Sequence, residues 1–410
     1  MKPATGPAGE RPTGRREPQR DLRQDQQRDE RDGQEDVREA VREAVQDAVR
    51  YDVTADAAAG RTTPRGASLV HPLPIGRKNR FARGYNRDAR EARMALEGAM
   101  ARVLTVAGAQ LGPIQRSDTK AQCVARMIEL MRRAKARGAQ LVVFPELALT
   151  TFFPRWLIED EAELDAYYER EVPNADTIAL FDESRRLGVG FYLGYAELVE
   201  EGGRKRRFNT SILVDTSGTI VGKYRKVHLP GHADYRPHLP FQHLEKRYFE
   251  PGDLGFPVWR TMGGVMGMAI CNDRRWPETY RVMGLKGVEL VMLGFNTPAM
   301  NRDGGEAHYL RVHHSNLVMS AGAYQNGTWV VGVAKAGREE GVDMTGSSII
   351  VAPSGEIVAQ SCTLGDELIV ADCDFDQCQF NKTTVFDFAA HRRIEHYGII
   401  TAQTGATPPP

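Results

Sequence analysis

The sequence lacks the features that mark membrane, secreted and nucleic-acid-binding proteins. Its 410 residues include no apolar run of 18 or more, which excludes a predicted membrane span. Lysine plus arginine equals aspartate plus glutamate at 54 each, so charge does not point to nucleic acid or a membrane surface. The N-terminus has no apolar signal-peptide core and is rich in acids, which argues against an organelle transit peptide.

Cysteine is scarce, and cofactor motifs are absent. The five cysteines are odd in number and irregularly spaced, which suits a reducing cytoplasm better than a disulfide framework. No GxGxxG or Walker pattern is present, and three histidines on one predicted helix lack the i, i+4 spacing of a zinc site. We therefore expect no cofactor and no metal. These histidines are His308, His313 and His314, and the cysteines are Cys123, Cys271, Cys362, Cys373 and Cys378.

Aromatic residues are absent from the first fifty positions, where Arg, Asp, Gln and Glu dominate. Such a segment cannot bury enough apolar surface to offset the entropy lost on ordering, so residues 1–100 are predicted to be a disordered charged extension and linker. Valines recur every four residues over 37–49, which fits a weak solvated helix or, alternatively, a partner-binding helix. We hypothesise that the functional start is Met94 or Met100, which the mass of the native protein tests.

Alternating strand and helix patterns begin after this extension. A strand at 102–110, a helix at 117–137 and a strand at 140–144 predict a parallel pair joined by a right-handed crossover. Segments 209–223 and 346–360 each contain a strand, a Ser-Gly turn and a second strand. The recurrence of this hairpin pattern suggests two related sheets.

These patterns predict an α/β domain over residues 101–400, built from two mixed sheets with helices on the outside. A flexible tail is expected at 401–410. Further helices are expected at 159–171, 175–186, 276–286 and 306–323, and further strands at 189–193, 265–270, 288–293 and 328–333.

One stretch combines a buried strand with the start of a helix. Val265–Ile270 is apolar, and Trp276–Glu278 has the proline and acid typical of a first helical turn. Cys271 lies between them, where backbone N–H groups and a helix start favour negative charge. This position predicts a lowered thiol pKa and a nucleophilic cysteine. The alternative is a buried, inert cysteine, which is the commoner role of a single cysteine.

Two other polar residues also follow predicted strands. Glu146 comes after the strand at 140–144, and Lys226 comes after a strand at 220–224. Because sites in open α/β sheets assemble at strand ends, we expect this acid and amine to meet the thiol of Cys271 in a nucleophilic site. Taken singly, Glu146 also fits an exposed loop acid, and Lys226 fits one more charge in a basic segment.

Three segments resemble the signature segments of the nitrilase, or carbon–nitrogen hydrolase, superfamily. They are Phe144–Thr150, Tyr224–Pro230 and Met268–Glu278, and the resemblance covers about residues 103–400. It implies an α-β-β-α sandwich, no cofactor, and a homo-oligomer, either a dimer or a tetramer. The implied catalytic triad is Glu146, Lys226 and Cys271.

A narrower resemblance connects the chain with N-carbamoyl-D-amino acid hydrolases. It rests on Pro145–Trp156, His228–His232, Pro240–Asp253 and Cys271–Arg275. It implies that Glu245 is a second acid beside the triad. The residues that it places around the substrate are Arg274, Arg275, Asn272, His228, His243, Asn296 and Thr297.

Arg274 and Arg275 are implied to receive a substrate carboxylate. Guanidinium groups suit this role because they donate two parallel hydrogen bonds to a carboxylate. The alternative, surface arginines at a helix start, is mildly disfavoured by the helix dipole. The loop at 299–305 departs from the pattern expected after Asn296-Thr297-Pro298, so the preference for the substrate side chain stays open.

The resemblance predicts hydrolysis of the carbamoyl C–N bond of an N-carbamoyl-D-amino acid. The products are the D-amino acid, carbon dioxide and ammonia, formed through a carbamoyl thioester on Cys271. The partner is a small molecule, not nucleic acid or a membrane. The alternatives are another amidase of the superfamily, such as a β-ureidopropionase, and a non-catalytic scaffold that uses the sandwich as a binding surface.

Overall fold

The computed structural model describes residues 101–300 and 306–409. The expected extension at 1–100, with the helix at 37–49 and the hypothetical start at Met94 or Met100, lies outside the described residues. Most of the departing loop at 299–305 lies outside them too.

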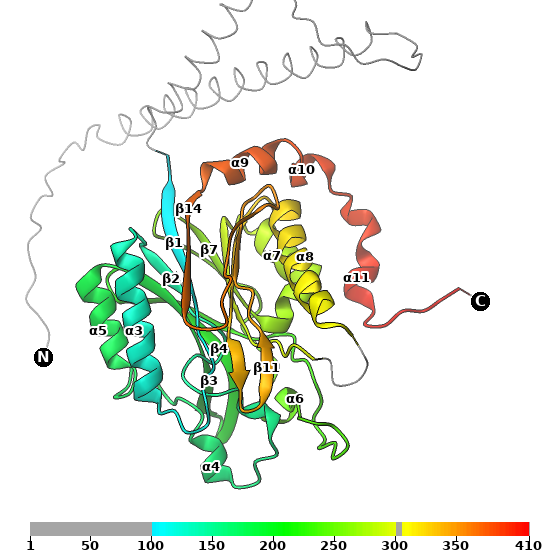
Figure 1. Cartoon of the computed structure of the whole chain (residues 1–410). Helices are drawn as coiled ribbons and strands as arrows, with labels where there is room; N and C mark the ends of the chain where they lie inside the picture. The colour runs from blue at the N-terminus through cyan, green and yellow to red at the C-terminus, as the bar shows by residue number, and fades with distance from the viewer. Residues whose placement is uncertain (1–100, 301–305, 410) are drawn as a thin grey trace, which may run out of the picture. The chain divides into compact units, whose positions relative to one another are not determined.

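Two six-stranded mixed sheets form the centre of the described domain (Figure 1). The strand order is β14-β1-β2-β3-β4-β5 in the first sheet and β13-β12-β9-β8-β7-β6 in the second. The central neighbours β1–β2–β3 and β7–β8–β9 run parallel, and the flanking pairs run antiparallel. The strands of the first sheet are β1 Val103–Gln110, β2 Leu141–Val143, β3 Gly190–Glu201, β4 Arg204–Val214, β5 Ile220–Arg225 and β14 Glu367–Asp374. Those of the second are β6 Val258–Thr261, β7 Gly264–Ile270, β8 Leu290–Phe295, β9 Trp329–Ala334, β12 Ile349–Val351 and β13 Ile357–Gln360.

Helices cover the outer face of each sheet. Helices α3 (Lys120–Ala136) and α5 (Ile178–Leu187) lie on one side, and α7 (Pro277–Leu285) and α8 (His308–Asn326) lie on the other (Figure 1). The α-β-β-α sandwich predicted from the sequence is therefore confirmed. The shorter elements are η1 Phe153–Arg155, α4 Glu161–Asp165, α6 Glu245–Tyr248, η2 Cys271–Arg275, the hairpin β10 Ala336–Glu339 and β11 Val342–Thr345, α9 Asp376–Thr383, α10 Phe388–His391, η3 Ile394–His396 and α11 Gly398–Ala402.

Local sequence explains the main elements. Helix α3 begins at a capping box, in which the Thr119 hydroxyl accepts from Gln122 N and the Gln122 side chain accepts from Thr119 N. Its apolar face, with Met127 and Met131, is buried against the first sheet. Every residue of β7 is buried, because one face of this strand meets the other sheet and the opposite face meets α7 and α8.

The helix expected at 159–171 is much shorter than predicted. Only α4, Glu161–Asp165, is helical, because tertiary pairing takes over the rest of the segment. Glu169 N donates to Ala196 O, and Leu198 N donates to Glu169 O, as in a strand. The Glu169 carboxylate also forms an ion pair with Lys120 at 2.5 Å. Long-range backbone pairing therefore overrides the local helical pattern.

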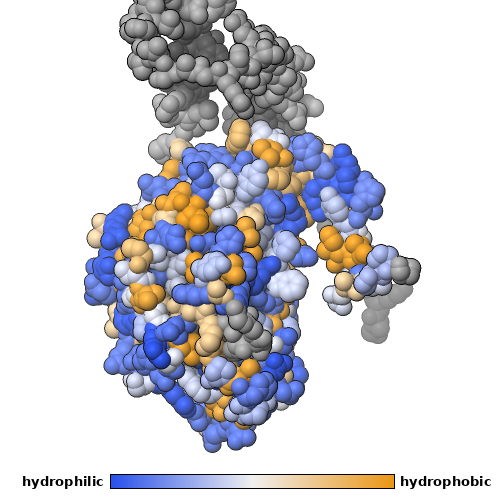
Figure 2. Space-filling view, turned by 45° about the vertical axis from the view of Figure 1, so that its right-hand side comes forward, coloured by the Kyte–Doolittle hydropathy of each residue, from blue (hydrophilic) through white to orange (hydrophobic). Residues whose placement is uncertain are grey.

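Hydrophobic and hydrophilic residues alternate in small groups on the face shown in Figure 2. Exposed apolar side chains occur on the C-terminal elements, among them Ile394, Ile399 and Ile400. Within 101–300 and 306–409, no helix combines the length and the apolar character needed to cross a membrane.

Candidate active site

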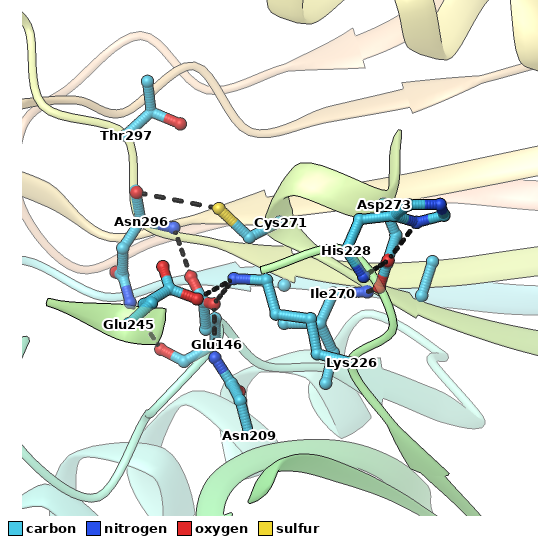
Figure 3. Close-up of polar contacts among 12 residues, drawn as sticks. Glu146, Asn209, Lys226, His228, Glu245, Ile270, Cys271, Asp273, Asn296 and Thr297 are labelled. Atoms are coloured by element: carbon cyan, nitrogen blue, oxygen red, sulfur yellow. Dashed lines mark hydrogen bonds and ion pairs between the residues drawn. The ribbon is translucent and has the colours of Figure 1, made fainter. Parts of the chain in front are cut away.

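The carboxyl ends of strands from both sheets supply one cluster of polar side chains (Figure 3). Glu146 follows β2 and Lys226 follows β5 in the first sheet. Cys271 follows β7 and Asn296 follows β8 in the second. The structure thus brings the predicted acid, amine and thiol together at the strand ends, as the sequence pattern indicated.

Lys226 joins two carboxylates in the interior of this cluster. Its Nζ lies 2.7 Å from Glu146 Oε1 and 2.6 Å from Glu245 Oε2. All three side chains are fully buried. Glu245, at the start of α6, also hydrogen-bonds His243 Nε2 through Oε1 at 2.8 Å. A buried ammonium between two carboxylates is held in one position with little freedom to rotate away.

Burial sets the charge states of this cluster. It raises the pKa of Glu146, and the charge of Glu245 adds to the rise while Lys226 opposes it. Burial likewise raises the pKa of Glu245 against the opposing effect of Lys226. Burial alone would lower the pKa of Lys226, but the two carboxylates outweigh it and raise that pKa well above its usual value. Lys226 therefore stays an ammonium, and a carboxylate with a raised pKa is suited to accept and return a proton.

Cys271 occupies a strained turn between β7 and η2. Its φ is +47°, in the left-handed region that non-glycine residues seldom adopt. The Sγ atom lies 3.8 Å from Asn296 O (Figure 3). It also lies 3.8 Å from Arg274 Nη1. Such a turn directs the side chain out of the sheet toward the other site residues.

The thiol of Cys271 differs from the sequence prediction in its pKa. Burial raises this pKa, and the charges of Glu146 and Glu245 add to the rise, against Lys226 and Arg274. The prediction of a lowered pKa was wrong, because it counted the helix start but neither the burial of the thiol nor the two carboxylates from distant segments. A nucleophilic role for this cysteine therefore requires a base that takes the thiol proton.

Asp273 fixes the turn that carries the nucleophile. Its Oδ2 accepts hydrogen bonds from Tyr224 Oη at 2.7 Å and from Ile270 N at 3.0 Å. Its Oδ1 accepts from His228 N at 2.9 Å and lies 2.8 Å from His228 Nδ1. The His228 ring also stacks on Trp276, with centroids 5.0 Å apart. His228, predicted to border the substrate, is thus tied to the turn.

Two asparagines orient the Glu146 carboxylate. Asn209 Nδ2 donates to Oε1 at 2.8 Å, and Asn296 N donates to Oε2 at 3.0 Å. Asn296 Nδ2 also donates to the Glu146 carbonyl at 3.0 Å. Asn296 was predicted to border the pocket, and the structure shows it holding the acid. Asn209 was not predicted, although its place in the β4 hairpin opposite Lys226 was a usable signal.

The two arginines after Cys271 lie in different environments. Arg274 is 1% exposed, and its Nη1 donates to Cys271 O at 2.6 Å. Its Nη2 donates to Thr297 Oγ1 at 2.9 Å, and its Nε donates to Ser315 Oγ at 3.2 Å. Arg274 and Thr297 therefore brace the turn, which differs from the prediction that both guanidinium groups receive a carboxylate. Arg275 is only partly buried.

The remaining predicted residues lie at the edge of this cluster. Asn272 is partly buried and directly follows Cys271. His243 meets the Phe152 ring edge-on, with centroids 5.5 Å apart. Within the described ranges, no group of three or more His, Cys, Asp or Glu side chains is arranged to hold a metal ion.

A family model described as "Carbon-nitrogen hydrolase" matches residues 105–382. The chain belongs to the carbon–nitrogen hydrolase family. The match covers more than half of the sequence and contains all three triad positions. The chain is therefore a hydrolase of amide-type carbon–nitrogen bonds.

Several characterised carbon–nitrogen hydrolases are similar to this chain. It is 29% identical to the N-carbamoylputrescine amidase of Arabidopsis thaliana, over 70% of this chain and 93% of that protein. It is 29% identical to the citrullinase of Francisella tularensis, over 64% of this chain and 87% of that protein. It is 30% identical to a nitrilase of Pyrococcus abyssi, over 66% of this chain and 90% of that protein. The superfamily predicted from the sequence is confirmed, and the narrower resemblance to N-carbamoyl-D-amino acid hydrolases stays a prediction.

Solved structures show the same fold. A carbon–nitrogen hydrolase from Helicobacter pylori G27 superposes with a TM-score of 0.64 at 22% identity, covering 74% of this chain and 99% of that one. An amidase from Nesterenkonia sp. AN1, with the acetamide moiety of fluoroacetamide added at its active site cysteine, superposes with a TM-score of 0.55 at 21% identity, covering 72% of this chain and 96% of that one.

Two glycines of this carbon–nitrogen hydrolase let the Glu146 backbone reach the site. A Cβ on Gly294, in β8, would lie 2.2 Å from Glu146 N and 2.4 Å from Pro145 C. A Cβ on Gly194, in β3, would lie 2.9 Å from Glu146 Cα. Both strands must therefore present a residue without a side chain where they flank the catalytic acid.

Gly294→Ala is expected to lower kcat on the order of 100-fold, because it displaces the Glu146 backbone by a fraction of an ångström to an ångström. It should also destabilise the fold by about 1–3 kcal/mol through overpacking. Steady-state kinetics and urea unfolding measure the two effects. Gly398→Ala is the matched control, since a Cβ there meets nothing within 4 Å. Wild-type kcat in Gly294→Ala would show that the Glu146 position is not critical.

Proposed function

We propose that this hydrolase cleaves the carbamoyl C–N bond of N-carbamoyl amino acids that carry a free carboxylate, with preference for the D-enantiomer. The observation that supports this most directly is the partly buried positive charge of Arg275, four residues after Cys271 and without an ion pair to a carboxylate among the described residues. The preference for the D-enantiomer rests on the resemblance of segments such as Cys271–Arg275 to N-carbamoyl-D-amino acid hydrolases.

Arg275 is a cation in an unfavourable setting. In the described part of the chain, no carboxylate forms an ion pair with it. Burial lowers its pKa to about 10, and the charges of Arg274 and Arg311 contribute to the decrease, while Cys271 and Glu306 oppose it. A bound carboxylate would offset the free-energy cost of burying this cation, and it would accept two parallel hydrogen bonds from the guanidinium group. The same charge would repel a substrate that ends in an ammonium group.

The characterised relatives support the carbamoyl part of the proposal. Two of the names, N-carbamoylputrescine amidase and citrullinase, refer to substrates that carry a ureido group. N-carbamoylputrescine ends in an amine and citrulline contains a carboxylate, so the ureido group is the shared element. The Arg275 charge then favours the carboxylate-bearing type of substrate for this chain.

The first half of the proposed reaction releases the amino acid. As Cys271 Sγ attacks the ureido carbonyl carbon, Glu146 accepts the thiol proton. Lys226 Nζ and the backbone N–H of Asn272 stabilise the tetrahedral oxyanion, and losing one such donor typically costs about 3–4 kcal/mol. The C–N bond to the amino acid then breaks, and Glu146 returns the proton to the leaving amine. A carbamoyl thioester remains on Cys271.

The second half regenerates the thiol. Glu146 removes a proton from water as the water oxygen attacks the thioester carbonyl. The C–S bond breaks and the proton returns to the sulfur. The released carbamate decomposes to carbon dioxide and ammonia. Glu245 keeps Lys226 in place through both halves, because its Oε2 accepts a second hydrogen bond from the Nζ that binds Glu146.

A substrate panel tests the proposal. Purified enzyme is incubated with enantiomer pairs of N-carbamoyl amino acids, a β-ureido acid, N-carbamoylputrescine and a simple nitrile, and ammonia release is measured. Turnover of N-carbamoyl-D-amino acids above the others supports the proposal. Preference for the β-ureido acid or for N-carbamoylputrescine would replace it with another amidase of the superfamily, and turnover of none would favour the non-catalytic scaffold.

Arg275→Ala is expected to raise KM for an N-carbamoyl amino acid by about 10–150-fold, which corresponds to the 1.5–3 kcal/mol of a charged hydrogen bond. The effect should fall mainly on KM, because the carboxylate is bound equally in the ground state and the transition state. Turnover of a neutral amide should change little.

Arg281→Ala is the control for Arg275→Ala. Arg281 is another arginine of this region, on α7, and its guanidinium lies over the Phe388 ring, away from the triad. It should keep wild-type KM. Unchanged KM in Arg275→Ala would remove the main support for a carboxylate-bearing substrate. The homo-oligomer expected from the family resemblance stays a prediction.

A further inference from the structure

A second buried ionic cluster lies outside the triad. Arg155 Nη1 lies 3.1 Å from Glu339 Oε1, and Lys335 Nζ lies 3.5 Å from Glu339 Oε2. The three residues are at most 3% exposed. Two cations thus share one anion in the interior. Since such clusters seldom repay the cost of desolvating their charges, stability alone does not account for it, and a role in positioning the chain does.

The cluster binds Ile114, whose N donates to Glu339 Oε2 at 3.1 Å, and residues 150–155, which begin four residues after Glu146. Glu339 Oε1 accepts from Phe152 N at 2.7 Å and from Thr151 Oγ1 at 3.2 Å. Lys335 Nζ donates to Thr150 O at 2.5 Å. Arg155, which ends η1 in this segment, also donates to the Glu339 carbonyl at 3.0 Å. The hairpin β10–β11 therefore fixes this segment through charged groups.

The same segment holds the chain that leads into Glu245. Gln242 N donates to Arg155 O at 3.1 Å, and Leu244 N donates to Pro154 O at 2.8 Å. The Phe152 ring also packs against the His243 ring, which hydrogen-bonds Glu245. Glu245 in turn binds Lys226. An unbroken series of contacts thus runs from Glu339 to the catalytic ammonium.

We propose that Glu339 is a positioning residue for the reaction: by fixing residues 150–155, it fixes 242–244 and so sets Glu245 against Lys226. Arg155 and Lys335 hold Glu339 ionised in its buried site. The inference rests on amide hydrolysis at the triad, as in the proposed function, but not on the choice of substrate. No role for this cluster follows from the signature segments alone.

Displacement of Glu245 has a recognisable consequence. Charged or titratable groups that act on Glu146 are Lys226, Glu245, Cys271 and Tyr192. The charge of Glu245 adds to the raised pKa of Glu146. If Glu245 moves away, that pKa falls, and activity persists to lower pH even though kcat is reduced. General loss of stability would not produce this combination.

The test is the double variant Lys335→Met/Glu339→Gln. It removes one cation and the only anion, so the net charge of the cluster stays the same and no second unpaired cation is created. We expect a folded protein whose kcat is lower by on the order of 100-fold, with little change in KM. The acid limb of kcat/KM against pH should move to lower pH.

Glu183→Gln is the matched control. Glu183 is also mostly buried and is shared by two arginines, Arg132 and Arg186, on α3 and α5. It should keep wild-type kcat and the wild-type pH profile. The assay uses whichever amide or ureide the wild-type enzyme turns over, so an error in the proposed substrate would appear in the wild type and not in the variants.

Wild-type kcat and an unmoved acid limb in the folded double variant would overturn the inference. If the double variant does not fold, Thr151→Val decides, because it removes only the hydroxyl that binds Glu339 Oε1. A lower kcat with the acid limb moved to lower pH supports the positioning role. A wild-type profile in Thr151→Val overturns it.

Discussion

Replacing Cys271 with alanine is expected to lower kcat by about 10⁶-fold, the size seen when a catalytic nucleophile is removed from a preorganised site. No other group in the cluster can form the thioester, since none of the remaining site side chains that the structure describes carries a thiol. The fold should persist, because alanine leaves the hydrogen bonds of Asp273 to the turn intact. Ammonia release and thermal unfolding measure the two properties.

Cys362→Ala is the control for this variant, since Cys362 is an exposed cysteine outside the site. It should retain full activity and leave stoichiometric labelling of Cys271 by iodoacetamide unchanged. Residual turnover in Cys271→Ala close to wild type would reject covalent catalysis by this thiol. Loss of activity in Cys362→Ala would show that the assignment of the nucleophile is wrong.

Glu146→Gln is expected to lower kcat by about 10⁴-fold, at the upper end of what a general base contributes. The amide keeps one acceptor oxygen, so it can accept from Asn209 or from Asn296 but not from both, and it cannot take the thiol proton. The variant should also make the thiol more acidic, because the charge of Glu146 adds to the rise that burial causes in the pKa of Cys271. The pH midpoint of iodoacetamide labelling should therefore move to lower pH while turnover falls.

Glu278→Gln is the matched control for Glu146→Gln. Glu278 is an exposed acid in the first turn of α7, seven residues after the nucleophile. It should leave turnover and the labelling midpoint unchanged. A labelling midpoint that rises in Glu146→Gln would contradict the electrostatic account of the site. Wild-type turnover in Glu146→Gln would require a different base, and Glu245 is the nearest alternative in the cluster.

Much of the fold was predictable because it depends on local patterns. Unbroken apolar runs such as Val265–Ile270 identify strands buried on both faces, and the structure places β7 there. The Ser-Gly hairpins at 209–223 and 346–360 also appear as predicted, as β4–β5 and β12–β13. The segment after Glu159 was predicted less well, since Glu169 takes its backbone partners from a distant strand.

The site was predictable in its composition but not in its electrostatics. Placement after strands was enough to bring together Glu146, Lys226 and Cys271. The pKa of the thiol is raised first by burial and then by two carboxylates, 125 and 26 residues away in sequence, so no local pattern reveals it. No role for Asn209 or Gly294 was predicted from the sequence, because each acts only through its contact with Glu146, which is distant in sequence.

The triad takes Glu146 and Lys226 from strand ends of the first sheet and Cys271 from a strand end of the second. Glu146 Oε2 accepts from Asn296 N across 150 residues of sequence, and Lys226 Nζ reaches Glu146 across 80. Neither half of the chain holds a working centre alone, and contacts of this range form slowly because long loops must close first. During refolding, enzymatic activity should therefore recover only when the two sheets pack together. Formation of the helices and strands alone should give no activity.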